Sequence, residues 1–376
     1  MPRTTSSRGR LMATLFAAQV CGSTGHSIGM AIGGIMAAGI TGTNTWSGMP
    51  VAVGALVGMV GVTVGSFVLL LGGMALFGVS QTSNLLSRYA AADVSPSAQR
   101  GRAMGLIVWG SSAGSMVGPN LMEPALRLGA SLGVAPAASA FLISLAGYAV
   151  AALLLELFLR PDPLAIARQL HETVSIGHAA QRARALGEIL TDVRVQLALA
   201  TLTISQFVMI STTSTSPVYL HDHGHTVQTI GVAVALHLGG MYVASPLSGW
   251  LCDRLGRLPM IGVGALVLTG AVLLAGLAPG SDRALVILGL FLNGVGWNFA
   301  FVAGSALLTD ALSPAERAST QGLADLFMGL MGAFGSAAGG MILGVWGFTV
   351  LNTLGAALVL GPLGATLLRR PVLSRT

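Results

Sequence analysis

The sequence predicts an all-α membrane protein, a polytopic bundle of transmembrane helices. Of its 376 residues, 53% are hydrophobic and only 9% are charged, and the charged residues form short islands. Between the islands the chain runs for about 20 residues or more without Asp, Glu or Arg, which is the length that a helix needs to cross ~30 Å of hydrocarbon. Lipid offers the backbone no hydrogen-bond partners, so helices are favoured. The alternating segments of a membrane β-barrel are not visible.

Ten segments are long and apolar enough to span a membrane as helices. They cover roughly residues 11–37, 51–87, 103–122, 137–159, 197–218, 229–251, 258–278, 284–308, 323–346 and 348–368. The first follows Arg3, Arg8 and Arg10, as a signal peptide would, but its apolar stretch is too long for one and we interpret it as a retained span.

The positive residues predict the orientation of these spans. The chain has no Lys, and a cytoplasmic amino terminus leaves only Arg127 and Arg283 of its 19 arginines outside. Because arginines gather in cytoplasmic loops, we expect a multi-pass inner-membrane protein with both termini in the cytoplasm. The net charge of +6 therefore indicates topology and not nucleic-acid binding. Cys21 and Cys252 lie far apart, which argues against a disulfide framework.

A charged stretch, Arg160 to Arg194, separates a half with four spans from a half with six. We therefore predict an amino-terminal lobe at residues 1–159, a cytoplasmic linker at 160–196 and a carboxy-terminal lobe at 197–376. Apolar residues recur in the linker at helical spacing, as in an amphipathic helix on a membrane surface. A plain solvated linker fits the same residues.

The two halves contain a weak internal repeat, a feature of many membrane transporters. The first copy consists of Gly73 to Gly78, Asp93, Ser95-Pro96, Arg100 and Gly105; the second consists of Gly289 to Gly294, Asp310, Ser313-Pro314, Arg317 and Gly322. Each copy ends one span, crosses a cytoplasmic loop and begins the next helix. The second helix start has the pattern of a capping box, with Ser313 as cap, Pro314 at the first helical position and Glu316 as the returning carboxylate.

The repeat exposes a shortened first half. Leu11 and Asp93 are 82 positions apart, whereas Leu197 and Asp310 are 113 apart, so the first half lacks 31 residues. The uncharged segment 51–87 would be ~55 Å long as one straight helix, which exceeds the bilayer. We expect one full span near 67–87, preceded by a Gly-rich, half-depth or broken segment at 51–65.

The loop after the sixth span carries a motif, Gly249-Trp-Leu-Cys-Asp253-Arg254-Leu-Gly256-Arg257. Gly256 allows a tight turn, Asp253 is placed to meet the positive end of a neighbouring helix, and the two arginines suit the cytoplasmic face. These residues resemble the G-x-x-x-D-R-x-G-R loop signature of the major facilitator superfamily, in its second-half position. An ordinary arginine-bearing turn has a similar composition.

The third span carries a second motif, formed by Gly105, Gly114, Gly118 and Pro119. It resembles the G-x8-G-x3-G-P part of the motif of drug/proton antiporters in that superfamily, although Met122 and Glu123 stand where a trailing Gly pair is usual. Small residues at this spacing let helices approach closely, and Pro119 can bend the helix at the interface between the lobes. General helix packing in membranes explains the same residues.

The resemblance covers nearly the whole chain and implies a two-lobe bundle with a cytoplasmic gate. It departs in one place, because family members carry another loop signature between their second and third helices, and that copy is missing here with most of two helices. By resemblance, Asp253 holds the helix that begins near Pro96, and the missing loop would have held the helix that begins at Pro314. The departure puts half of the gate, and transport competence, in question.

Several side chains are candidates for coupling or ligand binding. Ionisable groups at membrane depth are costly, so Asp325, ~16 Å along the helix from Pro314, is a candidate for proton coupling. His26 and His237 are candidates for proton relay. Structural hydrogen bonding for Asp325 and packing for the histidines are the alternatives. The resemblance places five further residues on helices that line the central cavity: Gln81, Asn84, Asn293, Trp297 and Asn298.

Three histidines, His221, His223 and His225, stand in the outer loop between the fifth and sixth spans. Alternate histidines can bind zinc or nickel, but no fourth ligand follows at a suitable spacing, and we expect neither a metal nor another cofactor.

The function that these features predict is secondary active transport of a small molecule, by proton-coupled efflux through alternating access. We expect a monomer whose partners are its substrate, protons and the lipid bilayer. Polar-nutrient uptake and a shortened, non-transporting scaffold or relic are the alternatives. The sequence contains no His-Glu-x-x-His zinc pattern and no evident catalytic pair, which argues against an enzyme.

Overall fold

The structure is a computed structural model. It describes residues 9–23, 87–132, 146–147, 149–151, 153–155, 157–158 and 184–368. Every regular element in these residues is a helix, which confirms the all-α prediction. The chain divides into two compact units, one of Met1–Ala91 with Ile107–Pro163 and the other of Ala92–Leu106 with Leu164–Thr376.

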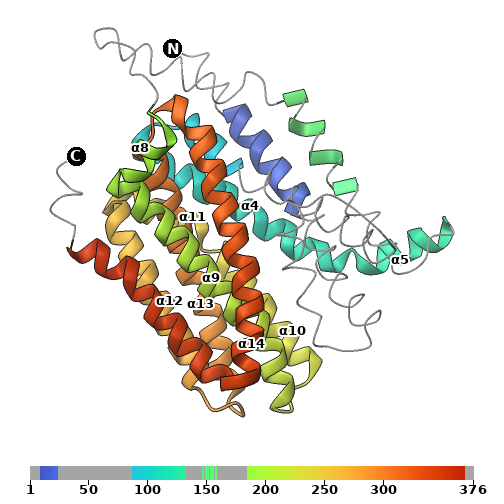
Figure 1. Ribbon diagram of the computed structural model, residues 1–376. Coiled ribbons are helices and arrows are strands. Elements are labelled where there is room, and N and C mark those ends of the chain that lie inside the picture. The colour runs from blue at the N-terminus through green and yellow to red at the C-terminus, as the bar shows by residue number, and fades with distance from the viewer. Residues whose placement is uncertain are drawn as a thin grey trace, which may run out of the picture. The chain divides into compact units, whose positions relative to one another are not determined.

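The second unit is a bundle of long helices in which α9, α12, α13 and α14 lie side by side (Figure 1). Its helices are α8 (Leu186–Thr191), α9 (Val193–Asp222), α10 (Val227–Tyr242), α11 (Ser245–Leu255), α12 (Arg257–Leu277), α13 (Arg283–Asp310) and α14 (Pro314–Leu368). α14 contains two helices in succession, because Gly347 has a positive φ of 84°. The six spans predicted for the second half all fall on these helices.

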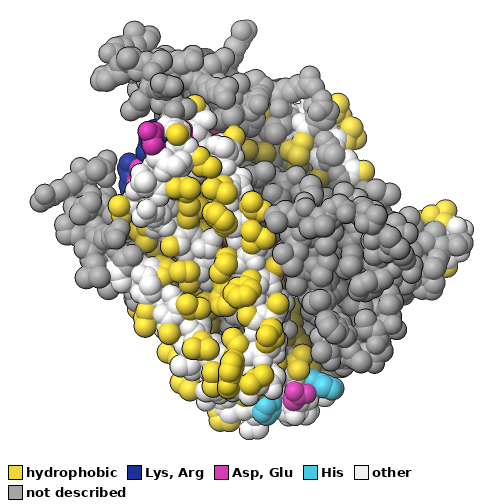
Figure 2. All heavy atoms as spheres, in the orientation of Figure 1, with side chains coloured by type: hydrophobic (Ala, Val, Ile, Leu, Met, Phe, Trp, Pro, Cys, Tyr) yellow, Lys and Arg dark blue, Asp and Glu magenta, His cyan; other side chains and the backbone are white. Residues whose placement is uncertain are grey.

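Within the described residues, five stretches are long and apolar enough to cross a membrane, with α10 and α11 counted as one. Figure 2 shows what this means for one face of the second unit: hydrophobic side chains cover its middle, while charged and histidine side chains gather at its two ends. An apolar band between polar ends is the pattern expected of a helix bundle that spans a bilayer.

Several helices start or end a few residues away from the predicted spans, and two of these differences have a clear local cause. α9 begins at Val193, four residues before the predicted span, because the side chain of Asp192 caps it by accepting a hydrogen bond from the backbone N–H of Arg194. The predicted span 229–251 is broken after Tyr242, where α10 ends. Pro246 has no N–H with which to continue the helical hydrogen bonds to the carbonyl of Tyr242.

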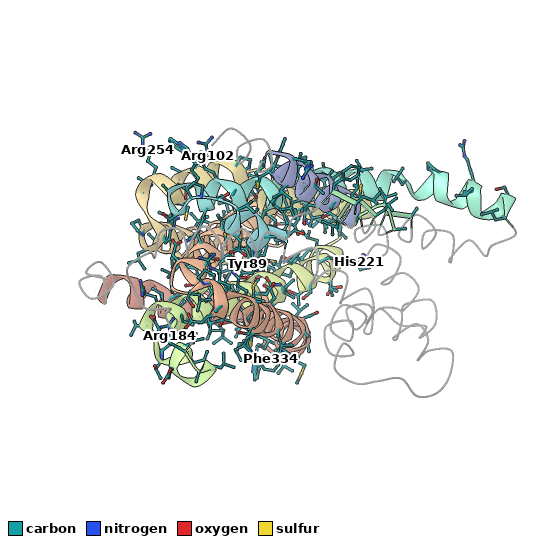
Figure 3. All side chains as sticks on the ribbon, turned by 90° about the horizontal axis from the view of Figure 1, so that it is seen from above. Tyr89, Arg102, Arg184, His221, Arg254 and Phe334 are labelled. Carbon is teal, nitrogen blue, oxygen red and sulfur yellow. The ribbon has the colours of Figure 1, made fainter. Side chains whose placement is uncertain are left out.

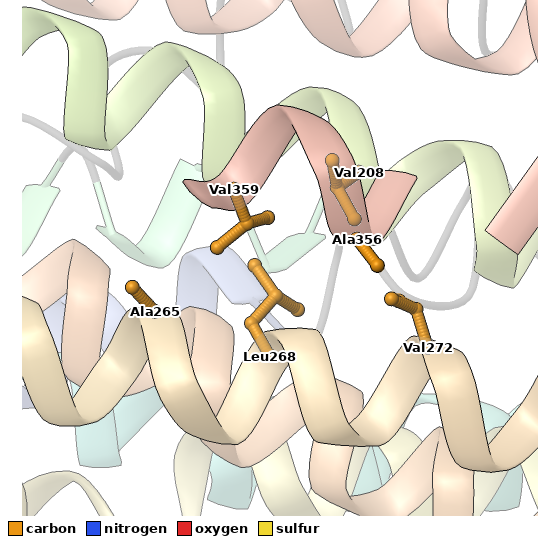
Figure 4. Close-up of a cluster of buried hydrophobic side chains, with 6 residues drawn as sticks. All are labelled: Val208, Ala265, Leu268, Val272, Ala356 and Val359. Atoms are coloured by element: carbon orange, nitrogen blue, oxygen red, sulfur yellow. The ribbon is translucent and has the colours of Figure 1, made fainter. Parts of the chain in front are cut away.

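The core of the second unit joins α9, α12 and the last part of α14 through a cluster of buried aliphatic side chains (Figure 4). The cluster consists of Val208, Ala265, Leu268, Val272, Ala356 and Val359. α12 and α13 approach each other closely at glycines: a Cβ added to Gly264 would lie 2.7 Å from the backbone nitrogen of Ala300. Close packing of this kind replaces the hydrophobic effect as the main attraction between helices in lipid.

The first unit is described more sparsely. Residues 9–23 form a helix, and α4 (Arg100–Asn120) begins in the second unit and continues into the first. Within the first unit Gln19 donates a hydrogen bond to Ser111 (Nε2 to Oγ, 2.6 Å), and the ring of Phe16 lies 5.7 Å from that of Trp109. After a break of one residue, α5 (Met122–Ser131) follows α4. The predicted half-depth segment at 51–65 lies outside the described residues.

A short 3-10 turn, η2 (Ser97–Gln99), precedes α4, and residues 87–93 before it are helical. This region, from the end of one helix to the start of the next, contains the part of the first repeat copy that the structure describes, from Asp93 to Gly105. It belongs to the second unit from Ala92 to Leu106, together with the second copy of the repeat around Asp310. The two copies can therefore be compared within one compact body.

Candidate functional site

The loop motif forms a one-residue turn between two helices. α11 ends at Leu255, Gly256 has a positive φ of 97°, and α12 begins at Arg257. A positive φ is easily adopted only by glycine. The turn brings Asp253 and Arg257 together, with 2.9 Å between Nη1 of the arginine and Oδ1 of the carboxylate.

The carboxylate of Asp253 caps the start of α4. Its Oδ1 accepts a hydrogen bond from the backbone N–H of Gly101 (2.9 Å), and its Oδ2 accepts one from that of Arg102 (2.8 Å). The first N–H groups of a helix have no partner within the helix and carry a partial positive charge. α4 has no acidic residue in its own first turn, so Asp253 from α11 supplies the negative charge that stabilises the start of the helix.

Small residues let α4 and α11 come close enough for this cap. A Cβ added to Gly101 would lie 2.6 Å from the carbonyl oxygen of Gly249, and one added to Gly249 would overlap the carbonyl oxygen of Gly101. A Cβ on Gly105 would likewise overlap the carbonyl oxygen of Ser245. The first glycine of the loop motif, Gly249, and the first glycine of the third-span motif, Gly105, therefore belong to one contact between the two helices.

The remaining residues of the third-span motif lie farther along α4. Gly114 is buried, and Gly118 and Pro119 occupy the last turn before α4 ends at Asn120. Arg102 and Arg254, the exposed arginines beside the cap, point away from the bundle on the same side (Figure 3). Arg254 stacks on the ring of Trp250, with its guanidinium carbon 5.1 Å from the ring centroid.

Two ion pairs connect the two copies of the internal repeat crosswise. Arg317 of the second copy contacts Asp93 of the first (Nη1 to Oδ1, 2.7 Å), and Arg100 of the first copy contacts Asp310 of the second (Nη1 to Oδ1, 2.6 Å). Arg257 joins them, with its Nε 3.0 Å from Oδ2 of Asp310. We call these six residues, Asp93, Arg100, Asp253, Arg257, Asp310 and Arg317, the gate cluster.

The crossed pairs are not among the contacts that we predict from the sequence, although the sequence contains a signal for them. In both copies the aspartate ends a helix and the arginine stands seven residues later, at the start of the next. The two pairs differ in burial: the side chains of Arg317 and Asp93 are 2% and 8% exposed, whereas that of Asp310 is 28% exposed. The ion pair between Arg317 and Asp93 is therefore the buried one.

A further arginine, Arg184, lies at the start of α14 (Figure 3). Its Nε donates to Oε1 of Glu316 (2.9 Å) and its Nη2 to Oε2 (3.1 Å). The start of α14 has the predicted capping pattern in part: Glu316 accepts a hydrogen bond from the backbone N–H of Ser313 (2.9 Å), and the helix begins at Pro314. The hydrogen bond to Glu316 raises the pKa of Arg184 above its ordinary value.

A second group of polar side chains lies deep in the second unit, between α9, α10 and α13. His237 places Nδ1 2.9 Å from the carbonyl oxygen of Leu290 and Nε2 3.2 Å from Oγ1 of Thr213. Trp297 donates its indole N–H to Oε1 of Gln206 (2.8 Å) and stacks on Phe301 at 4.5 Å between ring centroids. We call His237, Thr213, Gln206 and Trp297 the inner polar group.

The two asparagines predicted beside Trp297 lie in different surroundings. Asn298 donates two hydrogen bonds of 2.7 Å, to the carbonyl oxygen of Met241 and to Oγ of Ser245, and so joins α13 to the break between α10 and α11. Asn293 is fully buried, and among the described residues neither polar atom of its amide has a hydrogen-bond partner. Asp325 is buried on α14. His26, Gln81 and Asn84 lie outside the described residues.

Two of the three outer histidines contact backbone carbonyl oxygens. Nδ1 of His223 lies 2.7 Å from the carbonyl oxygen of Tyr219, and Nε2 of His225 lies 2.8 Å from that of Gly280. Among the described residues, no group of three or more His, Cys, Asp or Glu side chains could hold a metal ion.

Comparison with known proteins relates this architecture to one family. The model described as "Major Facilitator Superfamily" matches residues 200–375. The chain is 30% identical over 381 residues to the "Uncharacterized MFS-type transporter YddS" of Bacillus subtilis (strain 168), an alignment that covers 92% of this chain and 87% of that protein. It is 29% identical over 286 residues to the "Riboflavin transporter RfnT" of Brucella anthropi, covering 73% and 67%.

A shorter match and a solved structure complete the comparison. The "Multidrug resistance protein MdtL" of Klebsiella pneumoniae (strain 342) is 34% identical over 107 residues, or 28% of this chain and 27% of that one. The structure of the proton:xylose symporter XylE covers 98% of this chain and 96% of its own, with a TM-score of 0.67 at 14% identity, which shows a shared fold. This chain belongs to the major facilitator superfamily, and it is a membrane carrier of small molecules and not an enzyme.

Proposed function

We propose that the protein exports a hydrophobic or amphipathic small molecule in exchange for protons, by alternating access. The observation that carries this proposal is the gate cluster, in which two crossed ion pairs connect the ends and starts of four helix segments. A transporter that opens alternately to each side needs contacts on one side that form and break repeatedly.

Ion pairs suit such contacts for an energetic reason. Burying opposite charges costs hydration, and the attraction between them roughly offsets that cost. When the cluster separates, each charge regains water, so the open and closed arrangements differ little in free energy. A gate made of apolar side chains would instead expose its surface to water each time it opened.

Proton coupling is supported by the buried ionisable side chains. Asp325 lies eight residues after Arg317 on α14, or ~12 Å deeper along the helix. A carboxyl group in a low-dielectric environment is less costly to keep when protonated, so proton binding there favours burial. His237 contacts Thr213, whose hydroxyl can donate or accept, so that His237 can gain a proton without losing either hydrogen bond.

The export of an apolar compound is supported by the sparseness of charge in the spans. In the inner polar group, Trp297 and Phe301 offer stacked aromatic rings beside the amide of Gln206. Few polar groups among apolar walls are typical of sites that orient a largely apolar ligand. The similarity to the multidrug resistance protein MdtL, though limited to 107 residues, points in the same direction.

Uptake of a flavin-like nutrient is a second candidate. It is favoured by the similarity to the riboflavin transporter RfnT, which extends over 73% of the chain and is thus longer than the match to MdtL. Aromatic rings and an amide suit a planar heteroaromatic ligand as well as a lipophilic drug. The two candidates differ in the direction of transport and in the substrate.

Flux into proteoliposomes tests both candidates. We expect ethidium to accumulate in the wild-type vesicles only when a proton gradient is imposed, whereas riboflavin uptake without ethidium transport would support the second candidate. Absence of flux for a diverse panel would favour a non-transporting scaffold.

The substitution Asp325→Asn tests the coupling. We expect it to abolish the stimulation by the gradient while downhill exchange continues, because the amide cannot bind the proton. Asp222→Asn is the matched control, since Asp222 is an exposed carboxylate at the end of α9. A variant that keeps full stimulation would remove Asp325 from the coupling mechanism.

A further inference from the structure

The start of α14 is stabilised by a different set of contacts from the start of α4. Arg184 donates five hydrogen bonds, and three of them go to the carboxylate of Glu316. Its backbone N–H, its Nε and its Nη2 all donate to the oxygens of Glu316, at 2.9, 2.9 and 3.1 Å. Paired donation of this kind gives an arginine–carboxylate contact both strength and a defined geometry.

The same guanidinium reaches two further helix ends. Its Nη2 also donates to the carbonyl oxygen of Ala311 (3.1 Å), which follows the last residue of α13. Its Nη1 donates to Oδ2 of Asp192 (3.3 Å), the residue that caps α9. One side chain thus ties the end of α13, the start of α14 and the start of α9.

We propose that Arg184 is a positioning residue for the gate: it holds the first turn of α14 so that Arg317 meets Asp93. This inference rests on the proposed function, because it assigns Arg184 to the gate cluster of an alternating-access transporter. Asp253 fixes the start of α4 with a negative charge, and Arg184 fixes the start of α14 with a positive charge that binds Glu316.

The reversal of charge follows from the composition of the two helix starts. The start of a helix attracts negative charge. α4 has no acidic residue there and receives Asp253 from another helix, whereas α14 has Glu316 in its first turn. The side chain of Glu316 is only 3% exposed, so its carboxylate requires a cation as partner. The residue that partners Glu316 must therefore carry a positive charge, as Arg184 does.

The position of Glu316 explains how Arg184 acts on the gate. Glu316 and Arg317 are consecutive residues of the first turn, so fixing the carboxylate of one fixes the backbone that carries the other. The aspartate partner, Asp93, lies 2.7 Å from Arg317. Release of Glu316 would let this turn move and would loosen the contact between Arg317 and Asp93.

The test measures how often the first turn of α14 opens, and it needs no substrate. A thiol is introduced by Thr320→Cys in a background with Cys21→Ser and Cys252→Ala, since Thr320 is fully buried one turn beyond Glu316. The rate of modification by a water-soluble maleimide is measured in the full-length protein in nanodiscs. A second reporter, Ala333→Cys, is buried farther along α14 and detects general unfolding.

We expect Arg184→Gln to raise the modification rate at position 320 roughly tenfold or more, because it removes hydrogen bonds between charged groups. Arg184→Lys should give a smaller increase, since an ammonium keeps the charge but not the planar fork. The matched control is Arg194→Gln: Arg194 contacts Asp192 at 3.7 Å and is 32% exposed, compared with 36% for Arg184. This control should leave the rate unchanged.

A double variant distinguishes positioning from general stabilisation. If Arg184 acts through Arg317, then Arg184→Gln should add little in a background that already carries Arg317→Gln. Unchanged labelling in Arg184→Gln, an equal increase in Arg194→Gln, or a parallel increase at Ala333→Cys would each overturn the proposal. The expected labelling without flux of any compound would instead refute the proposed function and leave the positioning role intact.

Discussion

The starts of α4 and α14 are equivalent by sequence and are stabilised by different means. Each has a Ser-Pro pair at or just before the start of the helix, and in each an arginine stands seven residues after the aspartate that ends the preceding helix. Each arginine contacts the aspartate of the other copy. α4 is capped by Asp253 from a loop motif, whereas α14 has its own carboxylate, Glu316, held by Arg184.

The difference teaches that a helix start requires charge balance and not a particular motif. A carboxylate must face the exposed N–H groups of the first turn, and it can come from the same helix or from another. Where it comes from the same helix, a cation completes the balance. Two helix starts can therefore be stabilised although only one of them receives a carboxylate from a loop motif.

The largest expected effect separates the two crossed ion pairs. Arg317→Gln should lower the free energy of unfolding by about 3–5 kcal/mol, since it removes one partner of a buried ion pair. Arg100→Gln should cost about 1 kcal/mol, because Asp310 is partly exposed and keeps its contact with Arg257 at 3.0 Å. Equilibrium unfolding in mixed micelles measures both values. Equal losses would show that burial does not distinguish the pairs.

The sequence predicted what depends on local signals. The all-α class, the long apolar helices of the second half and the start of α14 at Pro314 follow from apolar length and capping patterns. The break after Tyr242 was also predictable, because Pro246 cannot continue the helical hydrogen bonds. These features depend on residues that are at most a few turns apart.

Contacts between distant residues could not be predicted in the same way. Arg317 and Asp93 are 224 residues apart, and Arg184 and Glu316 are 132 apart. The charge of a residue does not by itself identify its partner. The equal spacing from Asp to Arg in both copies was the one signal that related them. The roles assigned to Asp325, His237 and Trp297 stay predictions.

Smaller changes in the free energy of unfolding are expected at Gly105 and Gly322, which occupy equivalent positions in the two repeat copies. The two changes should have opposite signs. A Cβ on Gly105 would overlap the carbonyl oxygen of Ser245, whereas one on Gly322 would meet no described atom within 4 Å apart from its chain neighbours and the nearby backbone of its own helix. Gly105→Ala should therefore destabilise the protein by about 1–3 kcal/mol through overpacking. Gly322→Ala should stabilise it by up to about 1 kcal/mol, since alanine favours helix. The same unfolding assay measures both, and a loss at both sites would contradict the asymmetry.

The smallest effect concerns the turn that aims Asp253 at α4. Gly256→Ala forces a side chain into φ 97° and ψ 162°, a backbone region that is essentially restricted to glycine, and should cost about 1–2 kcal/mol. Gly347, with a φ of 84°, offers a matched control, because its kink in α14 carries no residue of the gate cluster. Both substitutions should lower the free energy of unfolding by similar amounts.

Only Gly256→Ala should also increase maleimide labelling of a thiol introduced by Ala103→Cys, since Ala103 is buried in the first turn of α4. The cap depends on the direction of the carboxylate as well as on its charge, so a strained turn should release α4 without removing any charge. Equal labelling in the two alanine variants would mean that the geometry of this turn does not control the cap.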